Sequence, residues 1–321
     1  MSKLGTNIYQ VYLYVKYAEM AEKAISYYHN SQSLGSRILR LFFKVFNIKG
    51  RLKKAHFSGK IKGADMPEPP AKLLKEISLT THDVNGRKVF TFTSPVATTK
   101  KHILFFHGGA YILNFTFLHW KLITRLVREI NCIVTAPDYP LLPDYSYKER
   151  LAMGEDVYKE LLKQTSADNI IFMGDSSGGN LALSLAQKLM VDKIAQPAQI
   201  ILISPWLDVT MNNPQMQEVS KRDPMLPLSD NKLGKLHAGD RDMKDFLVSP
   251  LYGSLKGLGK ISLFTGTDDI LNPDAKLLKS KAEIEGVKLN YFEYKHMLHD
   301  WIIFPISEAK LAFDQIVELL K

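Results

Sequence analysis

Cysteine is nearly absent from this sequence, with Cys132 alone among 321 residues. A single cysteine can form neither an intramolecular disulfide nor a cysteine-based metal cluster. It lies in the apolar run CIVTA, which favours a buried thiol over a reactive one. The chain also lacks an apolar run of the ~20 residues that span a bilayer. Its first twenty residues show neither a clean apolar core nor a cleavage site, so we expect no signal peptide. These absences favour a cytoplasmic or peripherally membrane-associated protein.

Acidic residues are scarce only at the start of the chain. Residues 1–60 hold eleven Lys/Arg and two acids, which accounts for the whole net charge of +9. The remaining bases and acids balance, so the body of the protein has no bias toward polyanions. Since no nucleic-acid-recognition motif accompanies the basic segment, we expect no nucleic-acid partner.

Short apolar, β-branched runs alternate with helix-length segments through most of the chain, which predicts βαβ units and a mostly parallel sheet. Asn85-Gly86 joins the first two runs and predicts an antiparallel hairpin. We therefore expect an α/β fold with eight strands and helices on both faces of the sheet. The predicted strands cover residues 76–82, 88–94, 103–106, 132–136, 170–173, 200–203, 261–265 and 288–294.

Two segments stand outside this alternation. Residues 7–29 and 36–49 read as helices, the second with an arginine- and lysine-containing polar stripe and an otherwise apolar surface, ended by Gly50. Three prolines in residues 63–72 indicate a linker. Residues 205–250 have too few apolar residues for a strand and are predicted to be an insertion above the sheet.

The stretch IIFMGDSSGGNLALSLA (170–186) joins a predicted strand to a predicted helix through a glycine-rich hinge. It matches G-x-S-x-G with Ser176 at the centre, the pattern of a nucleophile elbow in that strand-to-helix context. We interpret Ser176 as the nucleophile and the backbone N–H of Ser177 as an oxyanion donor. The loop FFHGGAY (105–111) predicts further donors at Gly108 and Gly109.

A serine nucleophile needs a base, and the base needs an acid to orient it. Candidates follow the last two strands, in the order serine, acid, histidine: Asp268 or Asp269 for the acid, and His296 or His299 for the base. The letters GDSSGG also approach the GDSGG of trypsin-like proteases. That class requires histidine before the serine, all-β barrels and usually disulfides, so the order and the single cysteine argue against it.

Six motifs together resemble the hormone-sensitive-lipase-like branch of the α/β-hydrolases. They occur in that family's order and spacing and cover roughly residues 75–320. The motifs are HGGA (107–110), APDYPLLPD (136–144), GDSSGGN (174–180), SPWLD (204–208), DDIL (268–271) and HDW (299–301). The resemblance implies an α/β-hydrolase fold with a helical cap and the activity of a serine carboxylesterase or lipase on short acyl esters.

The resemblance also assigns roles. The family's D-P-L falls on 269–271 and its H-G-F on 299–301, which makes Asp269 the acid and His299 the base for attack by Ser176. An acyl-enzyme follows, and neither a metal nor a cofactor is required. The supporting positions implied by the motifs are His107, Asp175, Asn180 and, as a loop brace, Asp144.

Three departures from the family pattern bear on these roles. Ala110 replaces the third glycine of H-G-G-G, Asp144 replaces a glutamate, and Ile270 replaces the proline of D-P-L. The first stiffens the oxyanion loop and alters the acyl pocket. The third weakens the choice between Asp268 and Asp269.

The resemblance divides the chain into an N-terminal helical cap segment (1–62), a hydrolase core (63–321) and a cap insertion (205–250). The basic helix over residues 37–49 either packs its apolar face on the body or contacts an anionic membrane through residues 37–54. A homodimer stays open as a second partner besides the small-molecule ester. Two alternative functions remain: an amidase or arylformamidase with the same triad, and a non-catalytic ligand-binding homologue.

Overall fold

The structure, a computed structural model, describes residues 24–58, 65–96, 99–228 and 231–321, with only the backbone for residues 55–58. The described residues form a sheet in the order β1-β9-β8-β7-β6-β4-β5-β3-β2. All neighbouring strands are parallel except β3, which runs antiparallel to both β5 and β2. The strands are β1 (Ser26–His29), β2 (Ser78–Val84), β3 (Arg87–Thr93), β4 (His102–Phe106), β5 (Ile133–Pro137), β6 (Ile170–Asp175), β7 (Gln199–Ile203), β8 (Lys260–Gly266) and β9 (Leu289–Tyr294).

All eight predicted strands are present, and the hairpin turn is at Asn85-Gly86, where both residues have positive φ. The ninth strand, β1, was not predicted. Residues 26–29 fall in a segment expected to be helical, but they form a parallel edge strand on β9. Tyr27 explains the difference, because its ring packs against Phe292 and Tyr294 of β9, a contact that only an extended backbone allows. The rest of that predicted helix, residues 7–23, lies outside the described residues.

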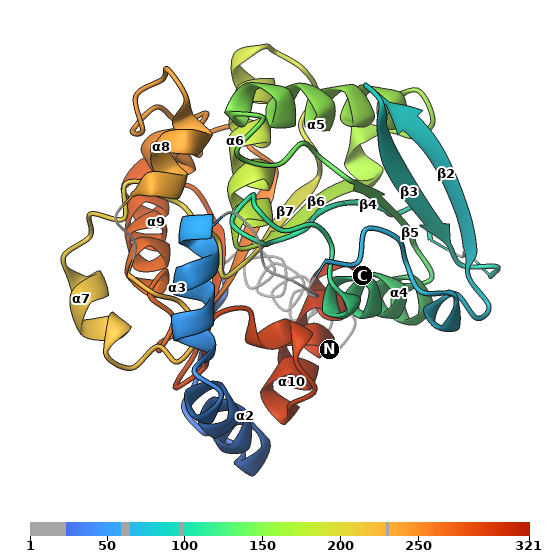
Figure 1. Ribbon diagram of the computed structural model, residues 1–321. Helices are drawn as coiled ribbons and strands as arrows, with labels where there is room; N and C mark the ends of the chain where they lie inside the picture. Colours follow the sequence, from blue (N-terminus) through green and yellow to red (C-terminus); the bar gives the residue numbers. More distant parts are fainter. Residues whose placement is uncertain (1–23, 59–64, 97–98, 229–230) are drawn as a thin grey trace, which may run out of the picture.

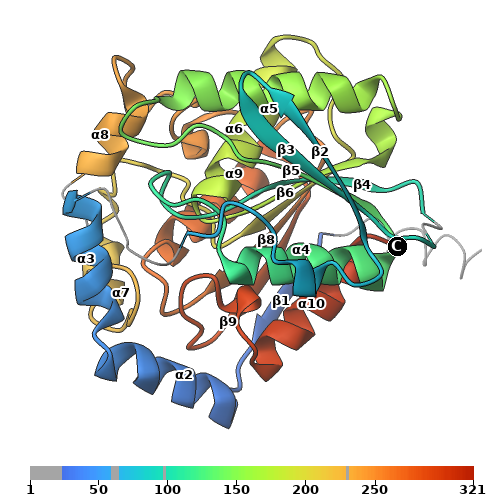
Figure 2. The ribbon, with the colours of Figure 1, turned by 45° about the vertical axis from the view of Figure 1, so that its right-hand side comes forward.

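Helices cover both faces of the sheet (Figures 1 and 2). In β4, Ile103 and Phe105 face the core shared with α4 and α10, while Leu104 and Phe106 face the core shared with α5, α6 and α9. A parallel sheet buried on both faces accounts for the unbroken apolar runs of its central strands. The helices are α2 (Leu34–Val45), α3 (Ile48–Ser58), α4 (Phe117–Ile130), α5 (Tyr147–Leu162), α6 (Ser177–Val191), α7 (Gln215–Ser220), α8 (Lys232–Ala238), α9 (Asn272–Glu285) and α10 (Ser307–Leu319), with 3-10 turns at η1 (Ala71–Leu73), η2 (Ala167–Asn169), η3 (Pro250–Tyr252) and η4 (Trp301–Ile303).

The predicted N-terminal helix over residues 36–49 is two helices. The chain turns at Asn47, which has a φ of 47°, and its side-chain Oδ1 accepts a hydrogen bond from the Gly50 amide at 3.2 Å. Gly50 was expected to end a helix, but it lies in the first turn of α3. Because Asn47 caps the second helix, the polar stripe of the sequence is divided between two axes.

The N-terminal helices lie beside the 205–250 segment, and α3, α7 and α8 gather on one side of the molecule in both views (Figures 1 and 2). As expected, the described residues of the 205–250 segment form no strand and only short helices. Lys49 of α3 joins the two segments, since its Nζ donates to the carbonyls of Ser220 (2.5 Å) and Asp223 (3.2 Å). Two segments that are far apart in sequence therefore form one contiguous layer.

Candidate active site

Ser176 lies at the sharp turn between β6 and α6, with φ 51° and ψ −117°. The glycines around it are required by close backbone contacts. A Cβ on Gly174 would lie 2.3 Å from the carbonyl oxygen of Gly178, and a Cβ on Gly178 would lie 2.0 Å from that of Phe106. The Ser176 amide donates to the carbonyl of Ile203 on β7 at 2.9 Å, which anchors the strained turn to the sheet. This is the geometry of a nucleophile elbow.

Two acid–histidine pairs form beyond the ends of β8 and β9, and they separate the candidates that the sequence left open. His299 Nδ1 lies 2.9 Å from Asp269 Oδ2, and both side chains are buried. Asp268 instead pairs with Arg40 at 2.7 Å, and the half-exposed His296 faces Asp268 at 3.5 Å. The structure thus brings Asp269 to His299 and turns Asp268 toward the N-terminal helices.

His299 has a second carboxylate neighbour that sequence reasoning missed. Its Nε2 lies 3.0 Å from Asp300 Oδ2. Burial lowers the pKa of His299, but the charges of Asp269 and Asp300 outweigh this and hold the pKa well above its usual value. Burial raises the pKa of Asp300 to about 7. Among the described residues, no hydrogen bond joins the Ser176 hydroxyl to His299, since Nε2 faces Asp300.

The predicted oxyanion loop follows β4. Gly109 has a φ of 123°, and Ala110 and Tyr111 also have positive φ, so the chain turns back toward the elbow. Gly108 packs against the elbow, since a Cβ there would lie 2.2 Å from Asp175 Oδ2. Ala110 lines the same pocket as Ser176.

Asp175 and His107 hold this loop against the elbow. His119 Nε2 of α4 lies 3.1 Å from Asp175 Oδ2 inside the core. Burial raises the pKa of Asp175, but the charge and hydrogen bond of His119 outweigh it and hold the pKa below its usual value. His107 stacks on Tyr139 with ring centroids 4.3 Å apart, and burial lowers the pKa of His107 to about 3. The elbow therefore rests on a buried ion pair beside a neutral imidazole.

Asn180 links the elbow to two other segments. Its Oδ1 accepts from the Tyr111 hydroxyl at 2.8 Å, and its Nδ2 donates to the carbonyls of Trp206 (2.8 Å) and Val248 (2.9 Å). Asn180, which was expected to have a supporting role, thus connects the oxyanion loop to both ends of the 205–250 segment.

Asp144 does not brace its loop, contrary to expectation, because its side chain is exposed and has no hydrogen bond among the described residues. Arg150 of α5 does so instead, donating to the carbonyls of Pro140 (3.1 Å) and Tyr145 (3.2 Å). Its guanidinium is fully buried, lies 4.4 Å from the Tyr111 ring centroid and contacts His237 at 2.9 Å. An arginine in a charged helical sequence gives no signal of burial, so it could not be predicted.

The pocket at Ser176 is apolar. Besides Ser176 and Ala110, its walls come from the 205–250 segment and from the residues after Asp269, and it has a volume of about 440 Å³ including its open mouth. The lining residues are Ala110, Ser176, Trp206, Met211, Leu226, Pro227, Leu233, Ile270 and Leu271.

The loop that carries Asp269 is attached to both the N-terminal helices and the 205–250 segment. Asp268 receives Arg40 of α2 at 2.7 Å and Arg222 at 3.3 Å. On the other side, Asp223 Oδ2 accepts from the Ile270 amide at 3.0 Å. These contacts hold the loop at the residues directly before and after Asp269.

Within the described residues, no group of histidine, cysteine and acidic side chains has an arrangement that could hold a metal ion. Cys132 is buried as expected, and burial raises the pKa of its thiol to about 12. Each helix in the part of the chain that the structure describes is too short or too polar to cross a bilayer.

Comparison with known proteins identifies the family. A family model described by its α/β-hydrolase fold matches residues 103–303. The chain is similar to an esterase of Acinetobacter venetianus, with 33% identity over 257 residues that cover 78% of this chain and 83% of the relative. It is also similar to a triacylglycerol lipase of Mycobacterium tuberculosis, with 29% identity over 228 residues, 71% of this chain but 47% of the lipase.

A solved structure agrees with these relatives. The crystal structure of EstE7, a hormone-sensitive-lipase homologue from a metagenome library, matches with a TM-score of 0.77 at 25% identity and covers 91% of this chain and 98% of that chain. The chain therefore belongs to the hormone-sensitive-lipase-like branch of the α/β-hydrolases, and it is a carboxylic ester hydrolase.

Proposed function

We propose that the protein is a serine carboxylesterase in which Ser176, His299 and Asp269 form the catalytic triad. The observation that carries this proposal is the 2.9 Å contact between His299 and Asp269. It lies at the carboxyl edge of the sheet, and Ile270 and Leu271, which directly follow Asp269, line the same pocket as Ser176. The family membership supports ester hydrolysis as the reaction.

The proposed reaction has two halves. His299 Nε2 takes the Ser176 proton as Oγ attacks the ester carbonyl, and Asp269 stabilises the imidazolium through Nδ1–H. The alcohol leaves with the proton from His299. Water then attacks the acyl-enzyme, with His299 again as the base, and the acid product departs.

We assign the oxyanion to the backbone amides of Gly109, Ala110 and Ser177, with Ala110 in place of the expected Gly108 because Ala110 lines the pocket of Ser176. Ser177 follows the nucleophile at the first turn of α6, where the helix end favours negative charge. Gly109 and Ala110 lie on the turn of the loop after β4, and Ala110 borders the pocket with Ser176. Each such donor contributes roughly 3–4 kcal/mol to stabilisation of the transition state.

Residues 1–62 and 205–250 are the proposed cap, and the core is residues 63–321. Five pocket residues come from 205–250: Trp206, Met211, Leu226, Pro227 and Leu233. Short acyl chains, which the family resemblance implies, are the proposed substrates.

Hydrolysis of a nitrophenyl ester series from acetate to laurate tests this function. We expect kcat/KM to be highest for the short chains and Ser176→Ala to remove the activity, while Ser177→Ala, which keeps the backbone N–H, retains it. Faster turnover of the matching anilides than of the esters would favour the amidase or arylformamidase instead. No turnover of either class, with binding of the esters intact, would favour the ligand-binding homologue.

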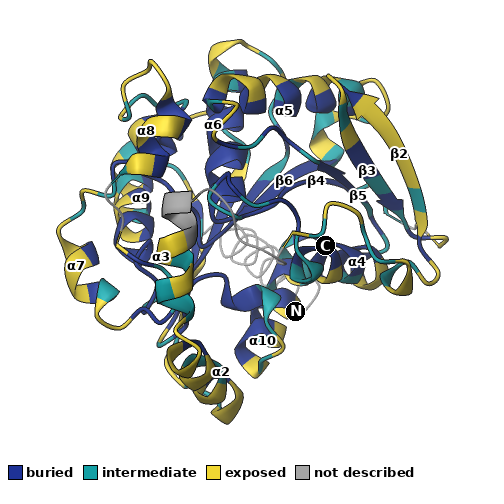
Figure 3. Ribbon diagram, viewed as in Figure 1, coloured by how far each residue is buried: buried dark blue, intermediate teal, exposed yellow. Residues whose placement is uncertain are grey.

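We further propose that α2 contacts an anionic membrane surface and presents lipid-like esters to the pocket. Six large apolar side chains recur along one face of this helix, and they are exposed, not packed on the body (Figure 3). Their exposed fractions are Leu34 73%, Ile38 58%, Leu41 61%, Phe42 49%, Val45 68% and Phe46 46%. The opposite face of α2 points inward through Ser36, Arg40 and Phe43.

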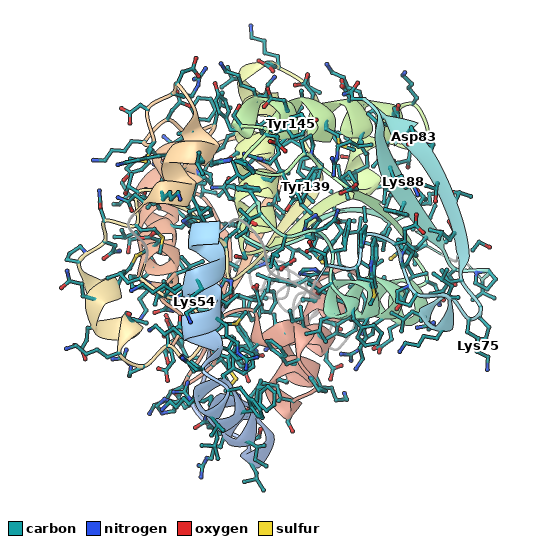
Figure 4. All side chains as sticks on the ribbon, viewed as in Figure 1. Lys54, Lys75, Asp83, Lys88, Tyr139 and Tyr145 are labelled. Carbon is teal, nitrogen blue, oxygen red and sulfur yellow. The ribbon has the colours of Figure 1, made fainter. Side chains whose placement is uncertain are left out.

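The charge around this face favours an anionic partner. Arg37 and Lys44 flank it on α2, and the exposed Lys53 and Lys54 follow on α3, where Figure 4 labels Lys54. An apolar helical face bordered by lysine and arginine is the pattern of an interfacial helix, and each base near an anionic surface contributes about 1 kcal/mol.

Vesicle sedimentation at physiological salt tests this contact. We expect the full chain to sediment with phosphatidylglycerol-containing vesicles and the double variant Leu41→Gln/Val45→Gln to lose at least about tenfold in partition coefficient. The matched control is Val191→Gln/Ile284→Gln, which alters exposed apolar residues elsewhere (65% and 86% exposed).

Two outcomes would contradict the contact. Equal recovery of the wild type and the α2 variant in the supernatant excludes the membrane. A dimer in gel filtration that the α2 variant abolishes, without vesicle binding by the wild type, assigns this face to a second copy of the chain.

A further inference from the structure

Both ring nitrogens of His299 face carboxylates. Nδ1 lies 2.9 Å from Asp269, and Nε2 lies 3.0 Å from Asp300. In the proposed function, on which this inference rests, Nε2 must accept the Ser176 proton. When both acids are ionised, a neutral imidazole, which has a single N–H, would direct a lone pair at one of the two carboxylates, and the two would repel each other. An imidazolium donates a hydrogen bond on each side, so the observed contacts fit the protonated ring.

Asp300 has little else to hold it. It is buried, and its φ of 52° is a left-handed conformation that costs a residue with a Cβ some strain. Its amide donates to the Ser204 hydroxyl at 3.2 Å, but its Oδ1 has no hydrogen-bond partner among the described residues. Among the residues that the structure describes, His299 therefore makes the one strong interaction with this carboxylate.

Several ionisable groups surround this contact. Asp269, which follows β8, and Asp175, the last residue of β6, add negative charge near Asp300. His119 of α4 is paired with Asp175. Burial lowers the pKa of His119, but the charges of Asp175 and Asp300 outweigh this and raise it. Asp223, from the 205–250 segment, lies behind Asp269. Asp175 and Asp269 already have partners of their own. The Asp300 carboxylate is therefore held at Nε2 of His299 only while that nitrogen carries a proton.

We propose that Asp300 is a positioning residue that sets the basicity of His299: it binds the Nε2–H of the resting imidazolium and competes with Ser176 for that nitrogen. Activity then requires the loss of one proton from the imidazolium to solvent and rotation of the Asp300 carboxylate away from Nε2. The neutral ring is free to accept the hydroxyl proton of Ser176 as its Oγ bonds to the ester carbon.

The sign of the pH effect follows from charge. A carboxylate beside the imidazolium stabilises the proton, so it raises the pH at which the base becomes active. Removing that charge lowers this pH, by about 1–3 units for a contact at this distance. Asp300→Asn keeps the shape of the side chain and removes its charge. We therefore expect the acid limb of the kcat/KM profile to move to lower pH, with at least a tenfold gain at pH 6 relative to the plateau.

The test is a set of pH profiles for ester hydrolysis by the wild type, Asp300→Asn and Asp300→Gly. Glycine accepts the left-handed backbone without strain, so it serves if the asparagine variant does not fold. The matched control is Asp83→Asn, an exposed acid of β2 that is labelled in Figure 4, and we expect its loss to leave the profile in place. Thermal unfolding and fluorophosphonate labelling report on the fold and on the elbow.

An acid limb that does not move in either Asp300 variant would overturn the proposal. So would a loss of activity at every pH equal to that of Asp269→Asn, because Asp300 would then be the orienting acid. Failure of the proposed function appears differently: Ser176→Ala would stay as active as the wild type, whatever the Asp300 variants do.

Discussion

Asp268 and Asp269 are adjacent in the chain but have opposite surroundings. The Asp269 carboxylate accepts from His299 and from the Leu271 amide at 2.9 Å each, inside the core. The Asp268 carboxylate contacts two arginines and the edge of an open polar pocket. Only Asp269 can control the tautomer of His299. We therefore expect substitutions of the two residues to have very different effects on the reaction.

We expect Asp269→Asn to lower kcat by roughly 10³–10⁴-fold, because an amide cannot stabilise the imidazolium and favours the wrong tautomer. Asp268→Asn is expected to lower kcat less than about tenfold, since its contacts do not reach the base. Steady-state kinetics on one short-chain ester measures both. A larger loss of kcat in Asp268→Asn than in Asp269→Asn would reverse the assignment.

At this scale the motifs predicted the acid–histidine pair but not the role of Asp144, and they gave no sign of the buried partners around that pair. Asp269 and His299 follow from the order of segments and from the family resemblance, and the structure places them together. Asp300 stands in the glycine place of the family's H-G-F, and nothing in the sequence shows that its carboxylate turns back to His299. Arg150 and His119 look like solvated helix residues, because burial depends on tertiary packing.

Among the elements, the loop after β8 is the point where the proposed cap meets the catalytic machinery. Arg40 of α2 donates to the His296 carbonyl at 2.9 Å and pairs with Asp268. The N-terminal helices are therefore bound to the residue directly before Asp269. Phe43 adds an apolar contact, with its ring centroid 5.5 Å from that of Phe304. Glu308 of α10 also holds the start of α2, since it accepts from the Ser33 amide at 2.6 Å and from the Ser36 hydroxyl at 3.0 Å.

We expect Arg40→Met to destabilise the fold by about 1–3 kcal/mol, because it leaves the buried Asp268 with weaker partners. In a thermal melt this corresponds to a fall in Tm of roughly 2–5 °C. KM should rise while kcat changes little, since the cap shapes the pocket and does not touch the reacting atoms. The matched control is Arg37→Met, an exposed residue one helical turn away. Equal melting temperatures and KM values for the two variants would contradict the role of Arg40.

Elements were predictable where the local pattern agrees with the packing. The central strands and the hairpin follow directly from their apolar runs and from Asn-Gly. The helix break at Asn47 and the edge strand β1 were not predicted, since both depend on partners far along the chain. The exposed apolar face of α2 differs from one of the two interpretations left open by the sequence, that this face packs on the body. Arg40 faces inward instead and pairs with Asp268.

In the whole molecule, the parallel sheet brings the ends of β6, β8 and β9 to one edge, so residues about 90 and 120 positions from Ser176 meet near it. The fold class and this meeting point were predicted from the alternation of segments and from the motifs. The two carboxylate contacts of His299 were not predicted, and neither were the contacts between the proposed cap and the loop that carries Asp269. Both depend on side-chain geometry.

Covalent labelling with a fluorophosphonate, followed by peptide mapping, tests the central claim most directly. The account predicts one adduct, on Ser176, which Ser176→Ala removes and Ser177→Ala leaves in place. An adduct on Ser177 or on any other residue, or a folded and ester-hydrolysing protein that takes no label, would contradict it.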